Sequence, residues 1–439
     1  MKNLLFLFYL ILLMLALNSS CKGTDSGTVN EIILSNPSDL VLKDQPVSID
    51  RKFIFPTDSV APNPVLLFGT DTLALQTNDL DRDGVWDELF LVADFEPNEK
   101  KTLQLSWSAS PLDHKVRTSV RFGKRKSSDS PIIPAKQETF DANKLPINLG
   151  YQAYQTDGPS WENDKVGFRH YLDGRNSKDV FGKTTSDMSP ENVGIDENGS
   201  VVDNYHAMED WGRDILSVGN SVGLGGYVLD TSNGLLRLGT VLGDSINNIG
   251  KTTFQILEEG PVNSVLEYKY ENWRPTDERT YNVVEKTSIW PGIYGYKNEV
   301  VIGNLQGDEN LLVGLVNIHN DSPIQVLDAN KDFIAIYTHD KQSYEKQWWL
   351  GMAIIVPKGD YLGYTEAPKS GIISNSFFAK IKIKDNEPTS YYAIAGWELS
   401  DSRFVDGSYF KEYLEDLIEQ LTVHIAIEYN IVEPEGFIK

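Results

Sequence analysis

Alternation of apolar and polar residues in short runs is the feature that most restricts the fold of this chain. In the clearest run, SVLEYKYENW, Leu266, Tyr268 and Tyr270 alternate with charged residues. A period of two puts the apolar residues on one face of a strand, so the run predicts a sheet with one buried and one solvated face. The runs YNVVEKTSIW, NEVVIGNL, DFIAIYTH and YYAIAGWEL continue this character without a strong internal repeat. So many strands predict an all-β fold with a large two-layer sandwich.

Changes in composition divide the chain into five predicted segments. Residues 1–20 resemble a signal peptide and 21–30 a polar tether, and residues 31–110 contain short strand-like runs typical of a small β-sandwich. Residues 111–145 are rich in Ser, Lys, Arg and Pro, which favours a strand followed by a linker. Residues 146–439 are predicted to form the large catalytic β-sandwich. Within them, apolar residues spaced as in Phe410, Leu414 and Leu417 predict an amphipathic helix from about Gly407 to Gln420. We expect the last run, VHIAIEY, to close the same domain.

The N-terminus predicts export and lipid anchoring. An apolar run follows Lys2 and leads to Cys21, the single cysteine of the chain. A cysteine directly after such a signal is the residue that is acylated in bacterial lipoproteins, and the alternative is a plain secretory signal. We therefore expect an exported protein attached by lipid to the outer membrane, on its periplasmic or cell-surface side. One cysteine excludes an internal disulfide.

The charge of the chain restricts its partners. Acidic residues number 63 against 40 basic ones, a formal net charge of −23. Nucleic acid requires a concentrated positive surface, so this balance argues against it. An anionic ligand would need a local basic pocket.

An acidic turn predicts one metal site. Asp79, Asp81, Asp83 and Asp87 form the pattern D-x-D-x-D-G-x-x-D-E around Gly84. Alternate carboxylates beside a glycine turn can converge on calcium, which prefers six to eight oxygen ligands. The pattern departs from an EF-hand loop at its twelfth position, where Phe90 replaces the bidentate glutamate. The turn therefore predicts either a structural calcium ion or a solvated acidic loop, and we expect no organic cofactor.

The segment from Trp161 to Gly226 combines charged, aromatic and glycine residues at a density that a structural core does not require, so we expect the active site here. Trp161 resembles a surface on which a sugar ring stacks, with the neighbouring polar residues binding its hydroxyls. The planar guanidinium of Arg169 suits a carboxylate or sulfate, or else an ion pair with Asp164 or Asp173. His170 would point to the opposite face of the same strand.

His206 is the stronger candidate for proton transfer. Its imidazole titrates near neutral pH, and a carboxylate among the residues that follow could orient it. Tyr205 could carry a second proton if Arg169 or Arg213 lowered its pKa. The sequence thus predicts the catalytic residues His206, Tyr205, Arg169 and His170, and the substrate-binding residues Trp161, Glu162, Asn163, Asp164, Arg175, Trp211, Arg213 and Asp214.

The two blocks WENDKVGFRHYLDGRNSKDVFGK and YHAMEDWGRDILSVGNSVGLGG resemble the signature of the domain-of-unknown-function family DUF4861, found in exported lipoproteins of polysaccharide-degrading bacteria. The resemblance covers nearly the whole mature chain. It implies a role in carbohydrate utilisation and a large domain similar to the galactose-mutarotase-like supersandwich. It also implies an oligosaccharide dehydratase of the type that acts on ulvan fragments, eliminating water from a non-reducing-end uronic acid to leave a 4,5-unsaturated residue.

Such an elimination needs a group that neutralises the uronate, a base and an acid. We expect Arg169 to neutralise the carboxylate, His206 to act as base or acid, and Tyr205 or His170 to complete the pair. The same groups would serve a polysaccharide lyase, which expels a sugar instead of water. The residues are also compatible with hydrolysis by paired carboxylates and with glycan binding without chemistry. In each case the partner is an acidic oligosaccharide or polysaccharide.

Overall fold

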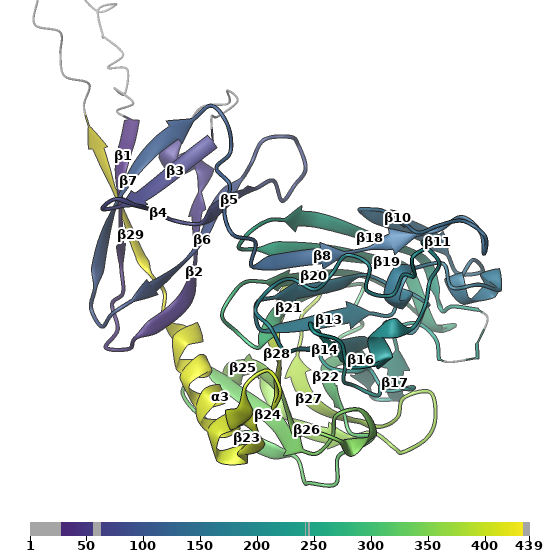
Figure 1. Cartoon of the computed structure of the whole chain (residues 1–439). Helices are drawn as coiled ribbons and strands as arrows, with labels where there is room; N and C mark the ends of the chain where they lie inside the picture. The colour runs from purple at the N-terminus through teal and green to yellow at the C-terminus, as the bar shows by residue number, and fades with distance from the viewer. Residues whose placement is uncertain (1–27, 56–62, 242, 245, 433–439) are drawn as a thin grey trace, which may run out of the picture.

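The computed structural model describes residues 28–55, 63–241, 243–244 and 246–432, and consists of two β-sandwiches (Figure 1). The predicted all-β fold is confirmed. The predicted signal peptide and Cys21 lie outside the described residues.

The small domain is a sandwich of a five-stranded and a three-stranded sheet. The five-stranded sheet has the order β29-β1-β7-β3-β4, and the other has the order β2-β6-β5. Their bounds are β1 Thr28–Ser35, β2 Leu42–Asp50, β3 Asn63–Phe68, β4 Asp71–Thr72, β5 Leu75–Asn78, β6 Glu88–Phe95, β7 Lys100–Ser108 and β29 Ala426–Val432, with one helical turn, α2, at Arg51–Ile54. The sheets enclose their own apolar core, which includes Ile32, Ile49, Leu66, Leu91 and Leu103.

The C-terminal strand belongs to the small domain and not to the large one. β29 pairs antiparallel with β1 from Thr28↔Val432 to Ser35↔Ala426. The prediction that the last run closes the large domain is therefore wrong. The predicted range of the large domain, 146–439, is wrong at its C-terminal end for the same reason. Figure 1 shows the first and last described strands side by side in the small domain. The pairing partner lies almost 400 residues away in sequence, and local periodicity carries no information about it.

The large domain is built from three main antiparallel sheets. The nine-stranded sheet runs β11-β18-β19-β20-β21-β28-β25-β24-β23, and the two five-stranded sheets run β15-β14-β13-β12-β8 and β17-β16-β22-β27-β26. In the same order, the bounds of the nine strands are Gln137–Asp141, Ile249–Glu259, Ser264–Thr276, Arg279–Ile289, Gly295–Gly303, Pro388–Trp397, Leu350–Pro357, Phe333–Asp340 and Gln325–Leu327. Those of the first five-stranded sheet are Gly212–Asp214, Lys178–Lys183, Val166–His170, Ser160–Asn163 and Thr118–Arg121, and those of the second are Gly234–Arg237, Tyr227–Thr231, Asn310–Val316, Ser376–Lys382 and Tyr361–Glu366.

The predicted linker at 111–145 is instead part of the large domain. It contributes β8 to a five-stranded sheet and β11 to the nine-stranded sheet, and it forms a small hairpin of β9 (Gly123–Lys124) and β10 (Ile133–Pro134). Its Ser- and Lys-rich composition reflects solvated connections between these short strands.

The large core lies between the sheets and follows the predicted alternation. Leu266, Tyr268 and Tyr270 of β19 are fully buried, whereas Lys269 between them is exposed.

Short 3-10 turns lie in the connections between the strands and before the C-terminal helix. Among the described residues these are η1 Pro146–Leu149, η2 Gln155–Asp157, η3 Asn204–His206, η4 Tyr344–Lys346, η5 Lys358–Asp360 and η6 Ser402–Val405.

The predicted amphipathic helix is confirmed as α3, Gly407–Thr422. The carboxylate of Asp406 caps its start by accepting a hydrogen bond from the Ser408 amide (2.8 Å). Its buried face, which includes Phe410, Leu414 and Ile418, covers β24 and β25. Within the residues that the structure describes, no helix has both the length and the apolar character needed to cross a membrane.

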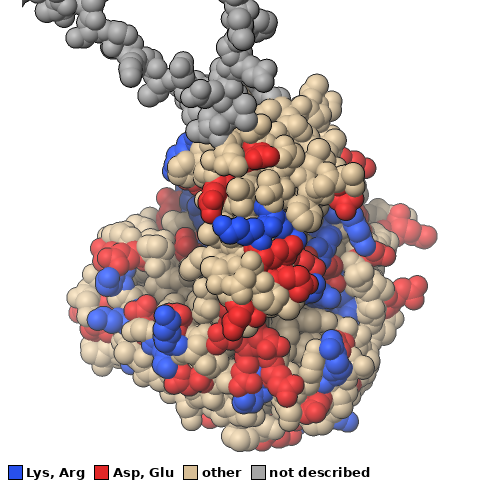
Figure 2. Space-filling view, turned by 90° about the vertical axis from the view of Figure 1, so that its left-hand side faces the viewer, with Lys and Arg blue, Asp and Glu red and all other residues tan. Residues whose placement is uncertain are grey.

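Polar contacts fasten the two domains together. Arg117 donates hydrogen bonds to Asp44 of the small domain (2.5 and 2.8 Å) and to Asp164 of the large domain (2.5 and 2.9 Å). Gln76 bonds the backbone of Asn263 through both its amide oxygen and its amide nitrogen. On the face shown in Figure 2, acidic and basic side chains are interspersed and no broad basic surface is visible.

Candidate functional site

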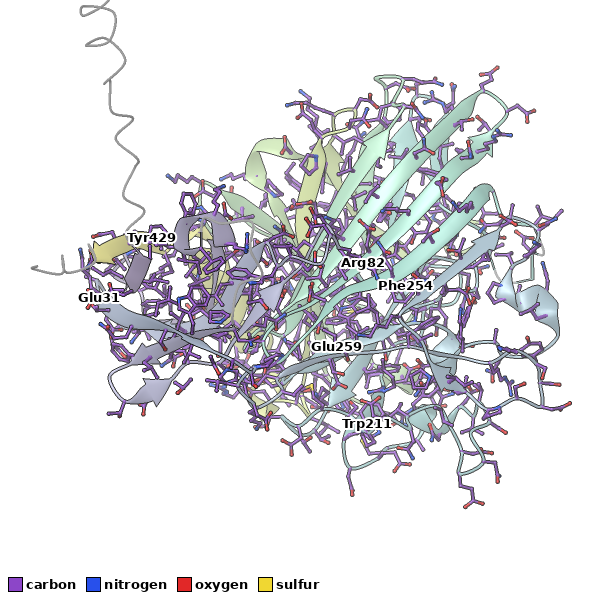
Figure 3. All side chains as sticks on the ribbon, turned by 90° about the horizontal axis from the view of Figure 1, so that it is seen from above. Glu31, Arg82, Trp211, Phe254, Glu259 and Tyr429 are labelled. Atoms are coloured by element: carbon purple, nitrogen blue, oxygen red, sulfur yellow. The ribbon has the colours of Figure 1, made fainter. Side chains whose placement is uncertain are left out.

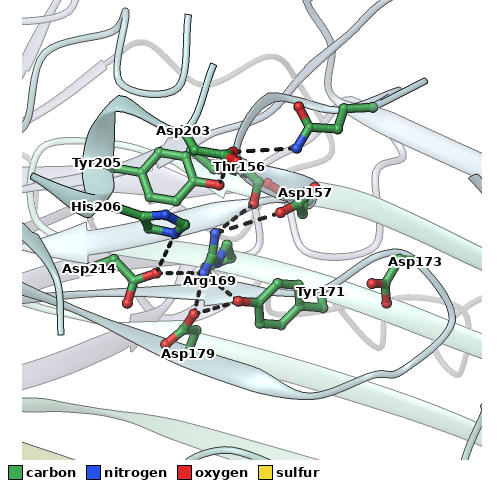
Figure 4. Close-up of polar contacts among 12 residues, drawn as sticks. Thr156, Asp157, Arg169, Tyr171, Asp173, Asp179, Asp203, Tyr205, His206 and Asp214 are labelled. Carbon is green, nitrogen blue, oxygen red and sulfur yellow. Dashed lines mark hydrogen bonds and ion pairs between the residues drawn. The ribbon is translucent and has the colours of Figure 1, made fainter. Parts of the chain in front are cut away.

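The outer face of the sheet β15-β14-β13-β12-β8 carries a connected cluster of charged side chains. Arg169 of β13 lies in register with Asp179 of β14, and Phe181 of β14 lies in register with Asp214 of β15. Paired residues of antiparallel strands share a face, so Arg169 and Asp179 project together. In Figure 3, Trp211 marks the start of β15 on the side of the domain away from the long strands of the nine-stranded sheet. Figure 4 shows the cluster.

Arg169 is enclosed by carboxylates and rings. Its guanidinium forms a very short contact with Asp179, lies 2.9 Å from Asp214 Oδ2, and donates to the Tyr171 hydroxyl (2.5 Å). The residue has no exposed surface. The prediction that Arg169 neutralises a substrate carboxylate is not supported, because the residue is fully buried and its Nη2 already pairs with two buried carboxylates. The ion pair that the sequence also allowed exists, but with Asp179 and Asp214 in place of Asp164 or Asp173.

His206 is the accessible member of this cluster. Its Nε2 lies 3.5 Å from Asp214 Oδ2, the oxygen that also binds Arg169, and 45% of its side chain is exposed against 5% for Asp214. The contact with Asp214 raises the pKa of His206, and partial burial and the charge of Arg169 oppose that rise. The arrangement is a solvent-facing imidazole held by a buried carboxylate, which can give or take a proton.

A strained turn lies next to Arg169. Thr156 and Asp157 both adopt left-handed backbone conformations, with φ of 50° and 60°, although neither is glycine. Such a conformation is rare for a β-branched residue and persists only where the surroundings enforce it. A Cβ on the following Gly158 would lie 2.0 Å from the His170 carbonyl oxygen, so the turn is pressed against β13.

The turn presents Asp157 beside Arg169, with Oδ2 at 3.9 Å from the guanidinium. The Asp157 side chain is 30% exposed. Burial raises its pKa, and the nearby Asp173 and Asp203 raise it further against the opposing charge of Arg169. A partly exposed carboxyl group with a raised pKa is suited to general acid or base chemistry.

Arg175 lies on the rim of the cluster and is half-buried. Its Nε donates to Asp173 (2.8 Å), and its guanidinium lies 3.8 Å from the centre of the Tyr171 ring. Tyr171 donates to Asp179 (2.9 Å), so it links the rim to the buried pair. Arg175 therefore lies close to the cluster with one carboxylate partner, and its binding of substrate stays a prediction.

Tyr205 and Trp211 are buried aromatic residues that pack beside the charged cluster. Tyr205 is 1% exposed and donates to Asp203 (3.1 Å). Burial raises the pKa of Tyr205 above its ordinary value, and the guanidinium of Arg169 only partly offsets this. The predicted lowering of that pKa is wrong. Trp211 is 7% exposed and packs edge-on against Phe181, so it is not an open platform for sugar.

His170 points into the core, on the opposite face from Arg169, as the strand geometry predicts. Its ring stacks on Tyr268 at 4.4 Å, and Nε2 lies 3.3 Å from Asn176 Oδ1. Burial, aided by the nearby Lys178 charge, lowers its pKa to about 3. It is fully buried, so its predicted catalytic role is wrong.

The predicted sugar-binding edge at 161–164 is structural. Trp161 is fully buried and packs edge-on against Tyr296. Glu162 pairs with Arg121 (3.1 Å) and Lys183 (2.5 Å), Asn163 binds the carbonyl oxygens of Trp290 and Ile293, and Asp164 accepts from Arg117. Composition alone does not distinguish a buried polar network from a binding surface, and the prediction failed for that reason.

Arg213 lies against two aromatic rings, one of which, Tyr344, also neighbours His206. Its guanidinium is 5.0 Å from the Tyr344 ring and 5.5 Å from the Trp348 ring. The residue is 7% exposed, so it supports these rings and does not itself face solvent.

The acidic turn of the small domain lies apart from this cluster. Asp79, Asp81 and Asp87 each offer a carboxylate oxygen within 4.8 Å of the others, and Asp83 is not part of the group. Arg82 in the same turn donates to Gln255 of β18 (2.7 Å), and Figure 3 shows it beside the long strands and far from Trp211. Three convergent carboxylates are compatible with a calcium ion, which stays a prediction.

Sequence reasoning missed four members of the cluster, Asp157, Tyr171, Asp179 and Asp203. One signal was available. Arg169 and Asp179 flank the turn YLDGRNS, and a hairpin register would have placed them opposite each other. Asp157-Gly158 is a turn signal, but Thr156 gives none, because tertiary contacts impose its backbone conformation.

The fold and the site define an all-β protein of two sandwiches with an accessible histidine on a buried carboxylate. The chain belongs to the family described as domain of unknown function DUF4861, whose model matches residues 34–427, and the resemblance seen in the sequence is thereby confirmed. A relative over almost the full length is Uncharacterized protein P7 of Formosa agariphila, 23% identical over 447 residues, with 97% of this chain and 99% of the relative covered.

Two solved structures from Enterococcus faecalis are also similar, an α-mannosidase and a protein of glycosyl hydrolase family 38. Each is 10% identical with a TM-score of 0.45 over 93% of this chain. The chain spans about half the length of either protein, with 46% and 48% covered.

Proposed function

We propose that this protein is a carbohydrate-active enzyme that eliminates water from a non-reducing-end uronic acid of an oligosaccharide. The observation that carries the proposal is the exposed His206 held by the buried Asp214 at 3.5 Å. An imidazole that faces solvent, with a fixed carboxylate behind it, is suited to transfer protons to and from a bound sugar. The carbohydrate setting comes from the family resemblance.

Of the three roles that the elimination requires, those of base and acid can be given to residues of the cluster. The proton at C5 of the uronate leaves to a base, the electron pair forms the C4–C5 double bond, and the C4 hydroxyl departs as water after it takes a proton from an acid. His206, whose pKa is raised by Asp214, is the acid. Asp157, partly exposed on the strained turn, is the base. Tyr205 and His170 are too deeply buried to contact the sugar.

Hydrolysis is the second candidate, and the acidic rim favours it. Asp157, Asp173 and Asp203 lie close enough that the latter two raise the pKa of the first. Paired carboxylates of this kind serve glycosidases when they flank a glycosidic bond. A lyase, which expels a sugar chain in place of water, would use the same groups as the dehydratase.

The test is incubation of the full chain with saturated uronate-terminated oligosaccharides. New ultraviolet absorbance without a change in chain length supports the dehydratase, absorbance with shortening supports the lyase, and shortening alone supports the hydrolase. His206→Ala should lower turnover by at least about a hundredfold, whereas His114→Ala, a histidine outside the cluster, should not change it. Binding without any product would refute an enzymatic role and leave a glycan-binding protein.

We further propose that the protein is exported and anchored by lipid at Cys21. Expression with radiolabelled fatty acid should label the wild-type chain, and Cys21→Ala should remove the label. A labelled Cys21→Ala chain, or an unlabelled wild-type chain, would refute the anchor.

A further inference from the structure

A second strained turn follows Tyr344, a neighbour of His206. In the described part of the chain, two consecutive non-glycine residues adopt left-handed conformations at only two places, Thr156–Asp157 and Glu345–Lys346, where φ is 56° and 57°. The first turn contacts Arg169, which shares Asp214 with His206. The second follows Tyr344, whose ring is nearly parallel to that of His206 at a centroid distance of 6.3 Å. Both strained turns are thus linked to one histidine, the first through Arg169 and Asp214 and the second through Tyr344.

Specific contacts hold this second turn in place. The buried Ser343 hydroxyl accepts from the Trp348 amide (2.9 Å) and donates to its carbonyl oxygen (3.0 Å), which closes a loop of six residues. The Tyr344 amide donates to the Ile215 carbonyl oxygen (2.7 Å), just after Asp214. The turn is therefore fixed to the segment that carries the carboxylate partner of His206.

The side chains of the turn form a surface suited to an acidic sugar. The rings of Tyr344 and Trp348 are partly exposed and are backed by the guanidinium of Arg213 at 5.0 and 5.5 Å. Such rings stack on the apolar C–H faces of sugars. His319 lies nearby, bonded to Ser217 (3.2 Å), and the charge of Lys346 contributes to lowering its pKa.

Lys346 is the cation of this surface that a ligand can reach. Its side chain is 43% exposed, and its ammonium lies 2.5 Å from Asp321, a carboxylate that is itself 78% exposed. A pair this exposed is weak, so a ligand anion can replace or join Asp321 at low cost. Arg169, by contrast, is fully buried between two carboxylates. The Tyr344–Trp348 turn, whose Tyr344 ring neighbours His206, therefore offers a substrate anion an accessible cation.

We propose that Tyr344, Lys346 and Trp348 form the subsite that binds the anionic ring substituent of the sugar whose reacting carbons lie at His206. The inference rests on the proposed function for the reaction, but it concerns binding alone. A carboxylate and a sulfate ester share the chemistry that Lys346 recognises, and the experiment separates them.

The experiment measures calorimetric binding to the full chain in a His206→Ala background, so that turnover does not consume the ligand. The probes are glucuronate-terminated sulfated ulvan oligosaccharides, their carboxyl-reduced counterparts and their desulfated counterparts. Lys346→Gln should weaken binding of the intact probe by about tenfold or more, the loss expected for a charge-assisted contact. Lys346→Arg, which retains the charge, should stay within about threefold. The modification that removes the sensitivity to Lys346 identifies the anion.

Lys358→Gln is the matched control. Lys358 pairs with Asp328 at 2.5 Å with similar exposure, 37% and 55%, at the opposite end of β25 from the Tyr344–Trp348 turn. Equal losses in Lys346→Gln and Lys358→Gln, unchanged binding in Lys346→Gln, or no binding of any acidic probe to the parent chain would each overturn the subsite. Binding that depends on Lys346 without turnover in the wild-type chain would refute the proposed reaction and leave the subsite standing.

Discussion

Replacing Asp214 by Asn tests whether this one carboxylate both raises the pKa of His206 and stabilises the fold through its buried ion pair with Arg169. Asp214 Oδ2 lies 2.9 Å from Arg169 and 3.5 Å from His206 Nε2. Asn keeps the size and one amide oxygen, so the substitution removes the negative charge with little change in packing. We expect a lower pKa of His206 and a less stable fold.

The size of each effect follows from burial. The contact with fully buried Arg169 is charge-assisted, but Asp179 remains as a second partner, so we expect a loss of about 1–3 kcal/mol in the free energy of unfolding. His206 is nearly half exposed, so solvent screening limits its contact with Asp214 to about 0.5–1 kcal/mol. Removal of the Asp214 charge should therefore lower the pKa of His206.

The direction in which stability changes with pH gives a further check. Asp214 raises the folded pKa of His206 above its ordinary value of 6.5. The contact therefore stabilises the fold fully below about pH 6.5, and this stabilisation is lost as the pH rises through the folded pKa. The difference in unfolding free energy between wild type and Asp214→Asn should be larger at about pH 5.5 than at about pH 8.5.

Two measurements test this. NMR titration of the imidazole Cε1 protons gives the pKa of His206, with its signal assigned by its loss in His206→Gln, and urea unfolding at the two pH values gives the stability. Asp203→Asn is the matched control, because Asp203 is exposed and only a minor contributor to the His206 pKa. An Asp214→Asn variant that folds normally with an unchanged or higher His206 pKa would refute the proposed pairing of His206 with Asp214.

Four other perturbations follow from the structure. Arg169→Met leaves two buried carboxylates without their cation and should cost about 3–5 kcal/mol by urea unfolding, and a loss below about 1 kcal/mol would contradict the buried network. Trp161→Ala should also cost about 3–5 kcal/mol through a core cavity, while oligosaccharide affinity measured below the unfolding transition stays unchanged. Thr156→Gly should relieve left-handed strain and leave stability unchanged or raised by about 1 kcal/mol, with lower turnover as the readout of misplaced Asp157. If the acidic turn binds calcium, calcium should raise the thermal midpoint of the metal-free chain and Asp87→Asn should remove that rise; equal midpoints with and without calcium would exclude the ion.

Local pattern predicted the elements well, and long-range pairing was outside its reach. The alternation at Leu266, Tyr268 and Tyr270 and the spacing along α3 are properties of neighbouring residues, so the sequence reports them directly. The assignment of β29 to the small domain depends on pairing with β1 at the far end of the chain. No periodicity distinguishes that partner from the edge of the large domain.

The sequence singled out the segment that carries the charged cluster, but not the contacts within it. His206 and Asp214 were both named as candidates, the first for catalysis and the second for substrate binding, because a histidine amid carboxylates is visible in the sequence. Arg169 was assigned to the substrate because an arginine in sequence has the same fork whether it is buried or exposed. Its burial is decided by the register that sets Asp179 opposite it and by the turn that covers it.

The two left-handed turns explain why sequence pattern did not predict some residues of the candidate site. A sequence predicts positive φ through glycine, asparagine or aspartate, and most single non-glycine examples in this chain are asparagines. Asp157 carries that signal, but Thr156, Glu345 and Lys346 do not. Evolution retains such strain where the position of a side chain matters more than the stability that an easier backbone would provide. One turn carries Asp157, and the other carries Lys346 directly after Tyr344, so the residues hardest to find from sequence are those that the proposed chemistry needs most.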